Sequence, residues 1–225
     1  MDGILVVNKA QRMTSHDVVD LVRRRFGLKK VGHAGTLDPI ATGVLVMLLG
    51  SYTKLSGALM AEDKEYEATL TLGGRSDTGD AWGNVVPSGA AVSFSREALE
   101  EAFARFRGEI EQVPPMYSAV KRDGRKLYEL ARKGVTVEVE PRKVTISRLE
   151  IKSAALPHVR FAMACSKGTY VRQLCADIGE ALGCGGYMSA LERTRSGAYT
   201  LAMSVGIEDL RRFGRAELAG KLISR

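Results

Sequence analysis

The chain has 225 residues, with 33 Lys or Arg against 26 Asp or Glu, so its formal net charge is +7. This length allows one large domain or two small ones, and the basic excess favours a polyanionic partner. The three cysteines form no CxxC pair and are odd in number, which argues against both a disulfide scaffold and a zinc site. No apolar stretch approaches the length of a membrane span, and the N-terminus lacks the regions of a signal peptide. We therefore expect a cytoplasmic protein without a metal site.

The first elements are predicted from an apolar run and a capping pattern. Residues 3–8 are mostly apolar and include β-branched side chains, which predicts a buried strand. Residues 14–17 read TSHD, a capping-box pattern that predicts the start of a helix. The helix places Val18 and Val22 inward and ends at Gly27.

The loop over residues 31–43, which read VGHAGTLDPIATG, organises the chain. It holds the carboxylate of Asp38 among glycines, and the following proline restricts Asp38 to extended or turn geometry. The apolar run at 44–49 predicts a buried strand that anchors the loop. A carboxylate held in this way suits a nucleophile or a base; alternatively, Asp38 only starts a turn. Gly50 then opens a predicted helix that reaches about Met60.

The middle of the chain alternates between clear and broken patterns. Strict alternation over residues 65–72 predicts a strand that turns Tyr66 inward. Residues 73–83 are rich in Gly and Asp and are expected to form a loop. Ser95 is the expected N-cap of a helix that Gly108 closes.

The segment at about residues 112–142 differs in character from its surroundings. Two prolines break regular structure, and a cluster of four Lys and Arg residues follows them. We expect an excursion from the core that is long enough to reach a partner. Residues 135–139, 144–151 and 159–165 each predict a strand, and their short connections favour an antiparallel meander.

A helix is predicted over residues 170–182, with Arg172 in its first turn. A cation at this position opposes the helix dipole, so Arg172 is a candidate to pair with a carboxylate. Residues 187–195 predict a further strand, and a short helical tail follows Ile207. The order of elements indicates a single α+β domain over residues 1–225.

Five motifs, in chain order, resemble those of the TruB family of bacterial tRNA pseudouridine synthases. They are GHAGTLDP at 32–39, DKEY at 63–66, RSDTGD at 75–80, PMYSAVK at 115–121 and CSKGTYVR at 165–172. The resemblance covers essentially the whole chain. It implies the pseudouridine-synthase fold, a central mixed, mostly antiparallel β-sheet flanked by helices, with an inserted RNA-binding thumb at about 112–142. It also implies the isomerisation of the T-loop uridine (position 55) of tRNA to pseudouridine.

The resemblance implies a role for each matching residue. Asp38 would attack the flipped nucleotide at C1′ or at C6, Arg172 would pair with Asp38, and Tyr66 would stack on the base and help to remove a proton. His33 would fill the T-loop when the uridine is extruded; alternatively, it makes a loop-stabilising hydrogen bond. Tyr170 and Leu191 would line the base pocket; alternatively, they are plain core. Lys9 and Lys54 would support the pocket or contact phosphate; alternatively, they face solvent. Four basic residues would bind backbone phosphates: Lys121, Arg122, Arg125 and Lys126.

Two departures from the family pattern stand out. The N-terminal K-P-x-G motif is KAQR at residues 9–12, so Ala10 and Arg12 replace the proline and the glycine. Many bacterial members also carry a C-terminal PUA-type RNA-binding domain, which this chain is expected to lack. The second departure bears on how the acceptor side of the tRNA docks.

The implied reaction needs no redox step, nucleotide hydrolysis or metal, so we expect no cofactor. We expect a monomer that binds the tRNA T-arm, with no obligate protein partner and no membrane association. Three alternatives remain: a T-arm-binding chaperone with weak or no catalysis, a catalytic subunit guided by RNA, and a Ser/Lys acyl hydrolase that uses Ser51 and Lys54. The acyl hydrolase lacks its partner motifs.

Overall fold

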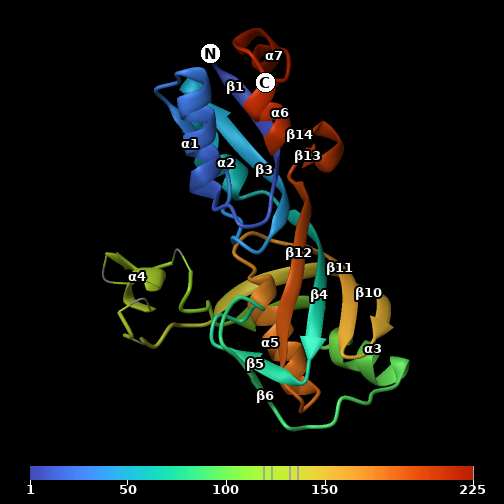
Figure 1. Ribbon diagram of the computed structural model, residues 1–225. Helices are drawn as coiled ribbons and strands as arrows, with labels where there is room; N and C mark the ends of the chain where they lie inside the picture. Colours follow the sequence, from blue (N-terminus) through green and yellow to red (C-terminus); the bar gives the residue numbers. More distant parts are fainter. Residues whose placement is uncertain (119, 123, 132, 136, 225) are drawn as a thin grey trace. The chain divides into compact units, whose positions relative to one another are not determined.

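A computed structural model describes residues 1–118, 120–122, 124–131, 133–135 and 137–224 (Figure 1). The chain divides into two compact units. The first comprises Met1–Glu67 and Leu191–Arg225, and the second comprises Ala68–Ala190. Strands β4 (Lys64–Leu72) and β12 (Gly186–Ser196) each contribute residues to both units. The expectation of a single domain over the whole chain stays a prediction.

The first unit is built on two long strands. Strand β1 (Gly3–Lys9) pairs antiparallel with β3 (Thr42–Leu49), in a register that places Ile4 opposite Leu48. The other strands extend this pair: β2 (Val31–His33) is antiparallel to β3, β14 (Val205–Gly206) is parallel to β1, β12 is parallel to β3, and β13 (Tyr199–Thr200) is antiparallel to β12.

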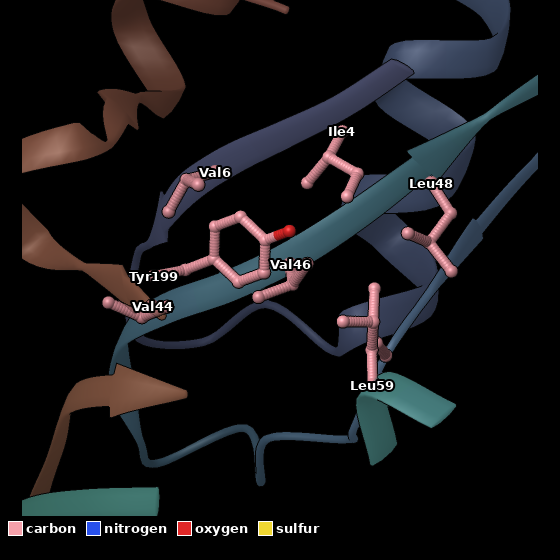
Figure 2. Close-up of a cluster of buried hydrophobic side chains, with 8 residues drawn as sticks. Ile4, Val6, Val44, Val46, Leu48, Leu59 and Tyr199 are labelled. Atoms are coloured by element: carbon pink, nitrogen blue, oxygen red, sulfur yellow. The ribbon is translucent and has the colours of Figure 1, made fainter. Parts of the chain in front are cut away.

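The core of the first unit explains why its two long strands read as continuous apolar runs. One face of β1 and β3 packs in the cluster drawn in Figure 2: Ile4, Val6, Val44, Val46, Leu48, Leu59 and Tyr199. The opposite face is buried as well, since Leu5 and Val7 are fully enclosed. A strand that is buried on both faces has no polar alternation, so the two buried strands predicted from the sequence are confirmed.

The helices of the first unit begin where their capping residues predict. Helix α1 (Ser15–Phe26) has the expected capping box between Thr14 and Asp17, and it ends at Gly27 in the left-handed conformation, with φ of 61°. The single helix expected from Gly50 is a 3-10 turn, η1 (Gly50–Leu55), followed by α2 (Ser56–Met60). The helical tail consists of α6 (Ile207–Arg212) and α7 (Arg215–Ala219).

The second unit contains the antiparallel strands β11 (His158–Cys165), β10 (Arg142–Ala155) and β7 (Gly108–Gln112), together with part of β4. Helix α3 (Arg96–Ala104) is capped by Ser95 as predicted, and Phe103 on this helix contacts Phe161 on β11, with ring centroids 5.5 Å apart. Helix α5 (Val171–Ala181) follows β11. The α+β class and the mixed, mostly antiparallel strand pairing are confirmed.

Two sequence predictions for this unit are wrong. Residues 135 and 137–139 form no strand, while Thr136 lies outside the described residues. The place beside β10 is taken by β7, which the sequence did not indicate, so the meander has different members. The loop expected over 73–83 contains strand β5 (Gly74–Ser76), which pairs with β6 (Val85–Pro87).

The basic segment forms a small structure of its own in the second unit. Strands β8 (Lys121–Arg122) and β9 (Arg125–Lys126) pair antiparallel, and α4 (Leu127–Ala131) follows directly. Leu127 is fully buried, and its N–H donates to the carbonyl of Val120 at 2.8 Å. The hairpin therefore has its own buried anchor.

Candidate active site

The loop that carries Asp38 runs between β2 and β3 and is fastened from both sides. The N–H of Ala34 donates to the carbonyl of Val46 at 2.8 Å. The N–H of Leu37 donates to the buried hydroxyl of Ser15 at 2.8 Å, and that hydroxyl donates back to the Leu37 carbonyl at 3.3 Å. The carboxylate-bearing residue itself stays half-buried. The structure therefore holds the loop on both sides of the Asp38 carboxylate, whose role as a nucleophile stays a prediction.

The backbone beside Asp38 is held by the segment in which this chain departs from the family motif. The N–H of Arg12 donates to the carbonyl of Pro39 at 2.9 Å. Arg12 has φ of +67°, and no other non-glycine residue in the described ranges has positive φ. Arg12 thus adopts a left-handed backbone conformation, which glycine accommodates more readily than arginine.

Lys9 is fully buried at the end of β1, so the solvent-facing alternative for this lysine is wrong. Its Nζ donates to the carbonyls of Ala10 at 2.9 Å and Met13 at 2.7 Å. Burial lowers the pKa of Lys9 to about 8, while the charge of Asp38 raises it and that of Arg193 lowers it further. The negative charge of Asp38 thus acts on the Lys9 ammonium, and the role of Lys9 in supporting the pocket stays a prediction.

Arg193 on β12 is also buried and donates hydrogen bonds to the Asp38 loop. It was not identified as a site residue from the sequence. Its side chain is 1% exposed. Its Nε donates to the carbonyl of Val44 at 2.7 Å, Nη1 to that of Thr36 at 3.2 Å, and Nη2 to that of Gly35 at 3.0 Å. The sequence offered one signal, an arginine within a strand-like segment, but that pattern usually indicates a solvated face.

The other predicted residues of the first unit lie on separate elements. Tyr66 is on β4 and 9% exposed, as the alternation predicts. Leu191 is buried on β12, whereas Lys54 is exposed in η1. His33 is half-buried at the end of β2, where burial and then the charge of Arg193 lower the pKa of its imidazole.

In the second unit, Arg172 lies in the first turn of α5 and is only 5% exposed. Its Nη1 donates to the carbonyl of Thr78 at 2.8 Å and its Nη2 to the carbonyl of Tyr117 at 2.9 Å. The guanidinium therefore joins the loop after β5 to the start of the basic segment. Its pairing with Asp38, which belongs to the first unit, stays a prediction.

The loop that accepts the hydrogen bond from Arg172 is ordered by an aspartate that sequence reasoning did not single out. Asp80 is 7% exposed, and its Oδ1 accepts from the hydroxyl of Thr78 at 3.0 Å and from the N–H of Trp82 at 2.9 Å. The N–H of Met188 also donates to the carbonyl of Gly79 at 3.0 Å. These contacts fix the loop whose Thr78 carbonyl accepts the hydrogen bond from Arg172.

Tyr170 immediately precedes α5 and is half-buried. The buried side chain of Gln112 holds its backbone at both ends: Gln112 Nε2 donates to the Tyr170 carbonyl at 3.1 Å, and the Tyr170 N–H donates to Gln112 Oε1 at 2.8 Å. Tyr170 is the N-cap residue of α5, and its own side chain makes no capping hydrogen bond. Gln112 therefore fixes the backbone from which α5 starts.

The four basic residues predicted to bind phosphate all belong to the β8–β9 hairpin. Lys121 pairs with Lys126, and Arg122 pairs with Arg125 in the strand register. Arg125 is exposed. The side chains of Lys121, Arg122 and Lys126 lie outside the described part of the structure. The register alone concentrates four positive charges on one short hairpin.

Two further features concern the described residues only. No group of three or more His, Cys, Asp or Glu side chains there is arranged to hold a metal ion. None of the helices there combines the length and apolar character needed to cross a membrane.

Comparison with known proteins identifies the family. The model described as TruB family pseudouridylate synthase (N terminal domain) matches residues 23–171. The model described as tRNA pseudouridylate synthase B C-terminal domain matches residues 172–222. The tRNA pseudouridine synthase B of Azoarcus sp. (strain BH72) is 51% identical over 210 residues, which are 93% of this chain and 70% of that protein. The enzyme of the same name from Syntrophotalea carbinolica is 48% identical over 208 residues, or 92% of this chain and 68% of that protein.

Solved structures give a consistent picture. A chain of the crystal structure of a Cbf5-Nop10-Gar1 complex aligns with a TM-score of 0.75 and 31% identity, over 94% of this chain and 54% of that one. A chain of an H/ACA RNP bound to a substrate RNA containing 2'-deoxyuridine aligns with a TM-score of 0.71 and 27% identity, over 99% and 56%. This chain therefore spans little more than half the length of these structural relatives. From the family models and the sequence identities together, the chain belongs to the TruB family of pseudouridylate synthases.

Proposed function

We propose that this chain isomerises the T-loop uridine (position 55) of tRNA to pseudouridine. The printed names of the relatives, tRNA pseudouridine synthase B, support the substrate class. The observation that carries the proposal is the state of Asp38: a half-buried carboxylate on a fastened loop, within electrostatic reach of the buried Lys9 ammonium. A nearby cation favours the ionised carboxylate that a nucleophile requires.

The chemistry assigned to Asp38 is an addition followed by an isomerisation. The uridine leaves its stack, and the Asp38 carboxylate attacks it at C1′ or at C6. The N1–C1′ bond breaks with its electron pair on the base, the base rotates, and a C5–C1′ bond forms. The bond between Asp38 and the nucleotide breaks to return the free carboxylate, the C5 proton leaves to restore the C5=C6 double bond, and N1 takes up a proton. Atoms and electrons balance without a cofactor, because the product is an isomer of the substrate.

The remaining predicted residues fit supporting roles. Tyr66, whose side chain is turned inward on β4, stacks on the base and assists removal of the C5 proton. Arg172 orients Asp38. Within the second unit, the Arg172 guanidinium donates to the carbonyls of Thr78 and Tyr117. His33 occupies the T-loop vacated by the uridine, and Tyr170 and Leu191 line the pocket. The residues Lys54, Lys121, Arg122, Arg125 and Lys126 contact backbone phosphates.

We also propose that the chain acts in the cytoplasm as a monomer, on free tRNA and without an obligate protein partner. The match to Cbf5-containing complexes raises the alternative of a subunit guided by RNA. An unmodified T-arm transcript, supplied with the purified chain alone, distinguishes the two. Turnover of this transcript supports autonomous catalysis, and its absence would favour a guided subunit or a chaperone.

The test measures tritium release from C5-labelled uridine in a tRNA T-arm transcript. Wild type and Asp38→Asn are compared at equal RNA occupancy, determined in parallel by filter binding. We expect release by the wild type and none by the variant, with binding retained. If neither protein releases tritium although both bind tightly, the proposal of autonomous catalysis fails, and the result favours an RNA-binding chaperone or a guided subunit.

A further inference from the structure

Arg193 is a buried cation for which the reaction proposed above has no use. Its guanidinium is enclosed, and its three hydrogen bonds go to backbone carbonyls on both sides of Asp38. Gly35 and Thr36 precede Asp38 in the loop, whereas Val44 follows it in β3. One planar group therefore joins the incoming arm of the loop to the outgoing arm.

We infer that Arg193 is the positioning residue that sets the geometry of the Asp38 loop. The loop-holding part of this inference stands without the proposed reaction, and its consequence for catalysis rests on that reaction. A guanidinium presents its donors in a fixed planar fork, so three simultaneous bonds fix the spacing of the arms. A lysine at this position offers one point charge on a flexible stem and cannot hold both arms at once.

One glycine lets the backbone of Arg193 lie close to the start of β3. Gly43 has φ of 99°, and a Cβ atom there would overlap the backbone of Arg193. The absence of a side chain at Gly43 therefore lets β12 approach β3 closely. At Gly35, which has φ of 104°, a Cβ atom would make an ordinary contact of 3.6 Å with Nη1 of the same arginine.

The charge of Arg193 is satisfied by hydrogen bonds but is not neutralised by its acceptors, because all three are neutral carbonyls. It acts on neighbouring groups: it contributes to the lowered pKa values of Lys9 and His33. Arg193 thus contributes both geometry and potential to the loop.

The experiment compares Arg193→Lys, which keeps the charge and loses the fork, with wild type. The control is Arg107→Lys, at a part-exposed arginine of the second unit that also donates Nε to a carbonyl, that of Leu149 at 3.0 Å. Amide hydrogen exchange is followed at Ala34, Leu37 and Ala41, whose N–H groups are hydrogen-bonded in the loop. We expect at least about tenfold faster exchange at these amides in Arg193→Lys, and wild-type rates in the control.

The catalytic consequence is read separately, as single-turnover tritium release per folded protein. For Arg193→Lys we expect at least about a tenfold slower rate constant with the dissociation constant for RNA unchanged within about twofold, since misplacement of a nucleophile costs rate rather than binding. A rate that equals wild type after correction for the folded fraction would reduce Arg193 to a fold-stabilising residue. Unchanged loop exchange would refute the inference outright.

The two proposals can fail separately. If the wild type releases no tritium, the proposed reaction is wrong, but the exchange measurement still decides whether Arg193 holds the loop. If Arg193→Lys does not fold, ¹⁵N spectra of the arginine side chains in the wild type replace it. Slow solvent exchange of the Arg193 Nε–H is expected, because its hydrogen bond to the Val44 carbonyl is buried. Fast exchange would refute the inference that Arg193 holds the loop.

Discussion

Arg12 offers the sharpest test of local reasoning, because its backbone conformation conflicts with its residue type. It is exposed, has φ of +67°, and anchors Pro39 only through its backbone N–H. A non-glycine residue in the left-handed region costs about 1–2 kcal/mol. Glycine removes this cost but adds about 0.5–1 kcal/mol of unfolded-state entropy. Arg12→Gly should therefore raise the free energy of unfolding by about 0.5–1 kcal/mol.

The gain corresponds to an increase in the melting temperature of about 1–4 °C for a chain of this size. Urea denaturation and differential scanning calorimetry measure it. Arg12→Ala is the matched control, because alanine removes the guanidinium, keeps the N–H and retains the backbone strain. We expect wild type and Arg12→Ala to differ little, and Arg12→Gly to be the most stable of the three. A glycine variant no more stable than the alanine variant would refute the assignment of strain to this position.

Three further predictions concern the supports of the site. Gly43→Ala places a methyl group against the β12 backbone and should cost about 2–4 kcal/mol in urea denaturation, whereas Gly27→Ala, with open space around it, should cost only about 1–2 kcal/mol. The pKa of Lys9 is lowered to about 8 in the folded state, so the unfolded state binds more protons above that pH. Between pH 8 and 10, the free energy of unfolding of wild type should therefore rise relative to that of Lys9→Met by on the order of 1 kcal/mol per pH unit. A flat difference in stability over that range would contradict it. Gln112→Ala removes the acceptor of the Tyr170 N–H, while the Tyr170 carbonyl keeps its hydrogen bond from the Leu174 N–H. The unfolding free energy should fall by about 1–3 kcal/mol, and an unchanged value would mean that water takes the place of the Gln112 side chain.

The sequence predicted those parts of the fold that depend on local signals. The TSHD capping box, the Gly27 helix end and the alternation that turns Tyr66 inward are each decided within a few residues, and each is confirmed. The identity of the strand beside β10 is decided by pairing across a long stretch of chain, which local alternation cannot reveal. Residues 135–139 alternate well, yet β7 takes that position.

The same distinction separates the site residues that were found from those that were missed. Asp38 and Arg172 lie in local patterns that are unusual in themselves, a glycine-rich Asp-Pro loop and a cation at a helix start. Arg193 has no unusual local pattern, and its acceptor at Thr36 lies 157 residues away in the sequence. Its burial is intelligible only once β12 is placed beside β3, because three carbonyls then replace the water that an arginine in a strand normally retains.

The buried cations of the first unit also determine how the Asp38→Asn experiment should be read. Lys9 and Arg193 donate to neutral carbonyls, so these acceptors leave the two positive charges in place. Asp38 supplies negative charge that acts on Lys9. Replacing it with asparagine leaves more positive potential at the loop, which favours polyanionic RNA. Loss of tritium release with equal or tighter RNA binding would therefore separate the missing nucleophile from a loss of affinity.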